Sequence, residues 1–109
     1  MMISVYITCK DMAEAKLIAT HLMEKRLIAC ANIFPVTSMF RWAGKVTSEP
    51  EVAMLCKAVK ENFGRIKEET RQLHSYEIPC IVALPWHGSD EDYRKWVEDE
   101  AKPVGSITR

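Results

Sequence analysis

The segment 28–59 constrains the fold of this 109-residue chain more strongly than any other part of its sequence. Residues 27–42 are rich in β-branched and aromatic side chains, and Val52 to Val59 form a second run of this kind. Ala43-Gly44 supplies a turn between them, so the pattern predicts an extended β-hairpin over 28–59. Pro35 lies inside the first strand, where we expect a bulge or bend because proline cannot donate to a sheet ladder.

Shorter signals precede this hairpin. Apolar and polar residues alternate over 3–9, which predicts a strand with one buried face. Asp11 predicts the start of a helix that runs to about Arg26. Its side chain can accept from the amide of the third helical residue while Glu14 reaches back, as in a capping box.

Two helices and a strand are expected after the hairpin. The first helix is amphipathic and ends near His74-Ser75, and its apolar face recurs at three- and four-residue intervals: Phe63, Ile66, Thr70 and Leu73. The apolar run from Pro79 to Trp86 predicts a short buried strand. Ser89-Asp90 caps a last helix that carries three bulky residues on one side: Tyr93, Trp96 and Val97.

The order strand, helix, strand, strand, helix, strand, helix is that of the ferredoxin-like split βαβ sandwich, an α+β fold. We expect one domain over 1–102 and a loose tail over 103–109. Two helices cover only one face of a four-stranded sheet. The long hairpin would therefore expose apolar side chains, and we predict a homo-oligomer that covers them: Ile33, Phe34, Met39, Phe40 and Trp42.

Composition and motifs exclude several classes of function. Fifteen basic and fifteen acidic side chains cancel, and the expected third strand has no aromatic residue for base stacking, so we expect no nucleic-acid partner. The longest apolar run, 27–36, is too short to span a membrane. The N-terminus lacks the pattern of a signal peptide, so we expect a cytoplasmic protein. The four cysteines form no C-x-x-C pair, and no phosphate-binding glycine motif is present.

His74 and Cys9 are the candidate metal ligands. Imidazole and thiolate favour copper and zinc over magnesium or calcium. His74 follows the end of a predicted helix, where it could instead stabilise the helix's negative end. Cys9 ends the first strand, where it could either face a site or fill the core. His87, before Gly88, is interpreted as an exposed turn residue.

A second possible group surrounds Lys57, which interrupts an apolar strand. It could lie at the sheet edge or pair with a carboxylate such as Glu77 in a cleft. Together with Tyr76 and His74, these side chains could bind a small anion or perform acid–base chemistry. The sequence leaves open whether they meet.

Four blocks make the sequence resemble the CutA family of divalent-cation tolerance proteins over residues 3–100. The blocks follow one another at compatible spacing: Thr8-Cys9 with Asp11, residues 25–33 (KRLIACANI), residues 41–45 (RWAGK), and residues 73–79 (LHSYEIP) leading into 81–85.

The resemblance implies a homotrimer whose long hairpins pair between subunits, and a role in tolerance of divalent metal ions. It implies copper(II) or another divalent cation as a ligand, not as a permanent cofactor, bound by His74 and Cys9. The chain departs from the family at Ser75, where proline is usual, and at Cys80, where glutamate is usual. The lost carboxylate weakens a hard-metal or acid–base interpretation.

Three functions follow as alternatives. The first is a trimer that binds divalent cations and is not an enzyme. The second is a structural scaffold or signalling trimer that holds a small molecule or protein partner in a cleft between subunits. The third is an enzyme or anion receptor. The cleft candidates, beside the two metal ligands, are Lys57, Tyr76, Glu77, Cys80 and Trp42.

Overall fold

The computed structural model describes residues 1–103 as a four-stranded antiparallel sheet with three α-helices, which confirms the predicted α+β, ferredoxin-like fold. The strands are β1 (Met2–Cys9), β2 (Cys30–Trp42), β3 (Lys45–Val59) and β4 (Ile81–Pro85). The α-helices are α1 (Met12–Glu24), α2 (Phe63–Leu73) and α3 (Glu91–Glu100), and a short 3₁₀ turn, Lys60–Asn62, precedes α2. The strand order is β2-β3-β1-β4, so β1 lies in the interior of the sheet.

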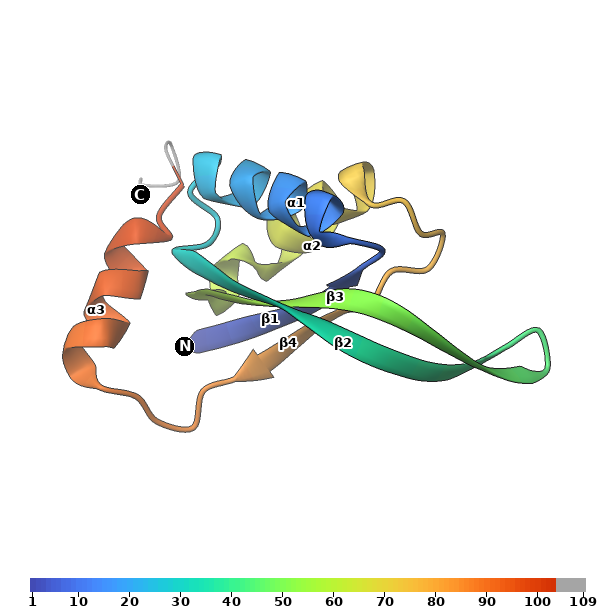
Figure 1. Ribbon diagram of the computed structural model, residues 1–109. Coiled ribbons are helices and arrows are strands. Elements are labelled where there is room, and N and C mark those ends of the chain that lie inside the picture. Colours follow the sequence, from blue (N-terminus) through green and yellow to red (C-terminus); the bar gives the residue numbers. More distant parts are fainter. Residues whose placement is uncertain (104–109) are drawn as a thin grey trace.

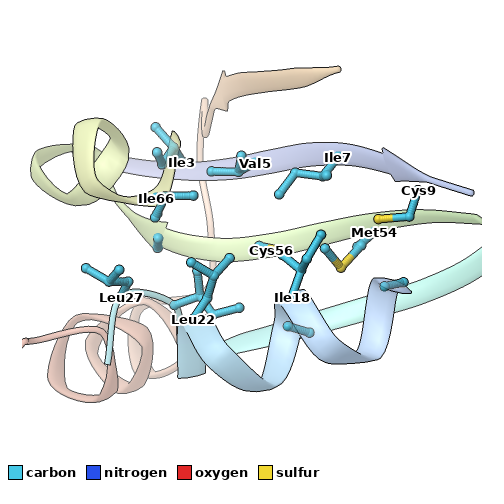
Figure 2. Close-up of a cluster of buried hydrophobic side chains, with 14 of the residues drawn as sticks. Ile3, Val5, Ile7, Cys9, Ile18, Leu22, Leu27, Met54, Cys56 and Ile66 are labelled. Carbon is cyan, nitrogen blue, oxygen red and sulfur yellow. The ribbon is translucent and has the colours of Figure 1, made fainter. Parts of the chain in front are cut away.

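Helices α1 and α2 cover one face of the sheet, and α3 lies beside the end opposite the hairpin tip (Figure 1). The core forms between these two helices and the sheet, from alternate residues of β1 and β3 and the inward face of α1 (Figure 2). Its fully buried members include Val5, Ile7, Ile18, Leu22 and Met54. The alternation of apolar and polar residues over 3–9 therefore predicted the buried face of β1 correctly.

The two strands of the hairpin pair without interruption. Every β2–β3 pair keeps the same register, from Cys30 opposite Lys57 to Trp42 opposite Lys45, so the predicted bulge at Pro35 is wrong. The two-residue turn has positive φ at both Ala43 (51°) and Gly44 (79°), the geometry that matches the twist of paired strands. Counted from this turn, Pro35 occupies a position without ladder hydrogen bonds, so its missing N–H removes none.

Beyond the end of β1, the hairpin becomes a two-stranded ribbon. The last β1–β3 pair is Cys9 with Val52, so residues 36–51 pair only with each other among the residues that the structure describes. Figure 1 shows this ribbon extending past the helices. Met39, Phe40 and Trp42 on it are exposed, as the sequence predicted, with Met39 71% and Trp42 56% exposed. Ile33 and Phe34, which were also expected to be exposed, are half-buried, and Ile33 packs against the core.

Two expectations need correction, the end of the first helix and the burial of the last strand. Helix α1 ends at Glu24 rather than near Arg26, because Arg26 adopts a positive φ of 57° and closes the helix through Arg26 N–H to Met23 O and Leu27 N–H to Leu22 O. Strand β4 is an edge strand with Val82 and Leu84 each 45% exposed, so it is not buried within this chain.

The expected loose tail, 103–109, lies outside the described residues except for Pro103, which is buried. Within the described part of the chain, no helix combines the length and hydropathy needed to cross a membrane. The cytoplasmic location stays a prediction.

Helix α1 offers a direct test of this core. Leu22 is fully buried, whereas Leu17 on the same helix is 56% exposed. We expect Leu22→Ala to lower the free energy of unfolding by about 2–5 kcal/mol, since it removes buried methyl groups and leaves a cavity. Leu17→Ala is the matched control and should change it by less than about 0.5 kcal/mol. Denaturant unfolding followed by circular dichroism would contradict this packing if the two variants were equally destabilised.

Candidate metal centre

Three side chains with metal-binding atoms converge where β1 ends. One ligand atom each from Cys9, Glu14 and His74 lies within 4.8 Å of the other two. They come from the last residue of β1, the first turn of α1 and the residue that follows α2. The two predicted metal ligands are therefore neighbours, and Glu14, which the sequence suggested only as a capping residue, lies beside them.

Local folding explains why Glu14 points to this place. Asp11 accepts a hydrogen bond from the Glu14 N–H at 2.8 Å and caps α1, as predicted. The Glu14 carboxylate does not return to the capping residue itself. It accepts from the N–H of Lys10 at 2.9 Å and of Ser75 at 2.7 Å, and so joins the start of α1 to the loop after α2.

These bonds hold the carboxylate in its charged form. Burial disfavours the charge of Glu14, but the hydrogen bonds from Lys10 and Ser75 outweigh it, so the pKa of Glu14 lies below its ordinary value. A carboxylate oxygen is thus present at the cluster over the physiological pH range.

The ring of His74 has a defined tautomer. Nδ1 accepts the backbone N–H of Tyr76 at 3.1 Å, so this nitrogen carries no proton. Nε2 lies 2.8 Å from the carbonyl oxygen of Thr8, which only accepts, so Nε2 carries the proton and donates it. The ring therefore contacts β1 and the following loop, and both of its nitrogens are hydrogen-bonded.

Cys9 lies on the core face of β1 and is fully buried. Burial, together with the charges of Glu14, Glu51 and Asp11, raises the pKa of its thiol to about 12. Cys9 is therefore a protonated core thiol at neutral pH, although its sulfur also faces the cluster. To ligate a metal it must lose this proton.

Tyr76 ties the cluster to the hairpin. Its hydroxyl donates to the carboxylate of Glu51 at 2.7 Å, and its ring lies 4.9 Å from that of His74, centroid to centroid. Burial and this hydrogen bond to Glu51 raise the pKa of Tyr76 well above its ordinary value. The phenol therefore remains a hydrogen-bond donor.

Lys57 belongs to a different group. Its ammonium contacts Asn32 and the sulfur of Cys30, and Cys30 also lies 3.4 Å from the hydroxyl of Tyr93. This hydrogen bond and burial raise the pKa of Tyr93 to about 12. No hydrogen bond or ion pair within residues 1–103 joins Lys57 to Glu77, which is exposed.

The remaining cleft candidates are also dispersed. Lys57 is five residues along β3 from the partner of Cys9, about 16 Å away at the rise of a strand. Trp42 adjoins the hairpin turn at the far end of the ribbon, whereas Cys80 is half-buried just before β4. The predicted cleft group therefore divides, within one chain, into the His74 cluster with Tyr76 and a separate Lys57 cluster.

Comparisons with known proteins agree with one another. The sequence profile of the CutA1 divalent ion tolerance protein family matches residues 3–100. The divalent-cation tolerance protein CutA of Archaeoglobus fulgidus is 40% identical over 95 residues, 87% of this chain and 93% of that protein. The human protein CutA is 35% identical over 105 residues, 94% of this chain and 59% of that protein.

Solved structures give the same result. The periplasmic divalent cation tolerance protein CutA from Archaeoglobus fulgidus superposes with a TM-score of 0.92 at 38% identity, covering 94% of this chain and all of that one. The corresponding Thermus thermophilus protein superposes with a TM-score of 0.89 at 39% identity, covering 92% and 98%.

Glu14 should make stability depend on pH. Because its pKa is lowered on folding, its contribution is present above the ordinary glutamate pKa of about 4.3 and is lost as the pH falls through the lower, folded-state value. At pH 7 we expect Glu14→Gln to lower the free energy of unfolding by about 1–3 kcal/mol, since it weakens two hydrogen bonds to a charged group. Denaturant titrations at pH 7, 5 and 3 measure this.

The matched control is Glu24→Gln, at the exposed end of the same helix. It should leave the free energy of unfolding nearly unchanged at each pH. If the free energy of unfolding of Glu14→Gln stayed below that of the wild type by the same amount down to pH 3, a role for the carboxylate charge would be contradicted.

Proposed function

Because the chain belongs to the CutA1 family of divalent ion tolerance proteins, we propose that it binds divalent cations reversibly at the cluster of Cys9, Glu14 and His74. The observation that supports this proposal is that three ligand atoms, contributed by three separate elements, lie within 4.8 Å of one another. The Archaeoglobus fulgidus and Thermus thermophilus relatives compared above are named for tolerance of divalent cations and not for a reaction. This favours a binding role over a catalytic one.

The donor set favours copper(II). Sulfur, imidazole nitrogen and one carboxylate oxygen suit borderline metals, and copper(II) stands highest among divalent first-row metals in general affinity, with zinc(II) below it. Three donors also leave coordination positions for water or another group. Magnesium and calcium prefer sites built from oxygen alone.

The same residues indicate that the cation is cargo and not a resident cofactor. The thiol of Cys9 holds its proton, both nitrogens of His74 are hydrogen-bonded, and Glu14 is satisfied by two N–H groups. The fold is thus complete without a metal, and a cation must compete with protons and internal hydrogen bonds. Such competition favours reversible binding that strengthens as the pH rises.

Copper titration tests the choice of ligand. We expect His74→Ala to weaken copper(II) binding at least about tenfold, because it removes a direct ligand and even outer-shell changes commonly cost 10–100-fold. His87→Ala, at an exposed position, is the control and should bind like the wild type. Titration calorimetry in a non-coordinating buffer measures both. Equal affinity of the wild type and His74→Ala would rule out His74 as a ligand.

We also propose that the chain forms a homotrimer through its hairpin and the uncovered sheet face. Exposed apolar side chains on the ribbon and β4 support this, since soluble monomers rarely leave such surface contiguous: Met39, Trp42, Val46, Val82 and Leu84. The ribbon also presents unpaired strand edges, which another copy can cover.

Light scattering coupled to size-exclusion chromatography should give three times the chain mass. Val46→Asp, with a charge on the exposed ribbon, should shift the distribution toward monomer. Lys45→Asp also changes charge beside the turn but removes no apolar surface, so it serves as the control. A wild-type mass of one chain would refute the trimer.

A scaffold or signalling trimer is the second candidate. It is favoured by Lys57, which has no carboxylate partner among the described residues and could hold an anionic ligand in a cleft between subunits. In that case removal of metal by a chelator should leave partner capture unchanged, whereas Lys57→Met should abolish it.

A further inference from the structure

His74 can act as a metal ligand only if its present hydrogen bonds break. A neutral imidazole has one lone pair in the ring plane, on the nitrogen without a proton. Here that lone pair is on Nδ1 and accepts the N–H of Tyr76. The ring cannot give the same lone pair to a cation and keep this hydrogen bond.

The conclusion does not depend on which nitrogen binds. If Nδ1 is the ligand, the cation displaces the Tyr76 N–H directly. If Nε2 were the ligand, the single N–H proton of the neutral ring would move from Nε2 to Nδ1, and the bond to Thr8 would be lost. Nδ1 is then a donor that faces another donor, so the Tyr76 N–H loses its acceptor in either case.

Tyr76 continues this link to the hairpin. Its side chain holds Glu51 through a 2.7 Å hydrogen bond, and Glu51 pairs with Val36 in the first rung beyond the end of β1. This rung is the root of the ribbon, where support by the rest of the sheet stops. Tyr76 thus makes two contacts. Its backbone N–H contacts the ring of His74, and its hydroxyl contacts the ribbon root.

On this basis, and resting on the proposed cation binding, we propose that His74, Tyr76 and Glu51 form a relay by which binding of a cation loosens the ribbon over residues 36–51. When His74 takes the cation, Tyr76 loses the N–H contact that fixes its backbone, and its hydroxyl no longer holds Glu51 in one position. The ribbon then opens more often at its root. Cation binding would thereby act on the same surface that we propose for contact between subunits.

Hydrogen exchange with mass analysis tests the relay on the full chain. We use zinc(II) because it does not oxidise thiols, and calorimetry on the same samples records binding. In the wild type, zinc(II) should raise exchange over residues 36–51 at least about threefold, since local opening governs the exchange of such amides. Exchange in the core strand β1 should not change.

Tyr76→Phe removes the hydroxyl and keeps the ring and the backbone N–H. Its ribbon should exchange faster without metal and should respond little to zinc(II). Because coupling between two equilibria is reciprocal, this variant should also bind zinc(II) about fivefold more tightly than the wild type. Tyr93→Phe removes a matched phenol in the Lys57 cluster and should change neither measurement. Glu51→Ala breaks the same bond from the other side and replaces Tyr76→Phe if that variant does not fold.

The outcomes separate the relay from the binding proposal. Zinc(II) binding to the wild type with unchanged ribbon exchange, or unchanged affinity in Tyr76→Phe, overturns the relay and leaves cation binding intact. Absence of zinc(II) and copper(II) binding in calorimetry overturns the binding proposal and the relay with it.

Discussion

The pairing of β1 with both of its neighbours is the constraint on which the rest of the structure depends. β1 lies inside the sheet, so its register with β3 and β4 decides which residues face the helices. Ile3, Val5, Ile7 and Cys9 share the face that α1 and α2 cover. Because side chains alternate strictly along a strand, a slip by one residue would expose this whole set. The same register also fixes where β1 ends, and therefore where the cluster forms and where the ribbon begins.

The cluster at that end is polar, yet almost every group in it is satisfied. Thr8, Tyr76, Lys10 and Ser75 provide backbone partners for the ring of His74 and for the Glu14 carboxylate. Buried polar groups are costly only when they lack such partners. The cluster therefore connects three elements of the fold while it retains donor atoms that a metal could use. Structural and binding roles share the same residues here.

Most of the fold was predictable from the sequence because it follows from local periodicity and capping. The order of elements and the Asp11 cap agree with expectation, whereas Cys9 and His74 were placed together only by the resemblance to the CutA family. The errors have a common cause, which is that pairing between distant segments is not visible in local patterns. Pro35 suggested a bulge or bend because the sequence does not show which positions lack ladder bonds, and for the same reason it left open whether Lys57 meets Glu77. Glu14 and Glu51 gave no local signal of their contacts with Ser75 and Tyr76.

The unbroken register of the hairpin has a consequence for how this protein can change over evolution. The turn at Ala43-Gly44 sets the pairing of all the rungs that follow. A single deletion in one strand would turn the side chains of that strand to the opposite face, whereas loss of two residues from each strand preserves every remaining partner, its face and the alternation of ladder bonds. Each such paired step changes the reach of the ribbon by about 7 Å. We therefore expect homologous chains to differ in hairpin length by matched insertions or deletions, which adjust its span without disturbing the centre at its root.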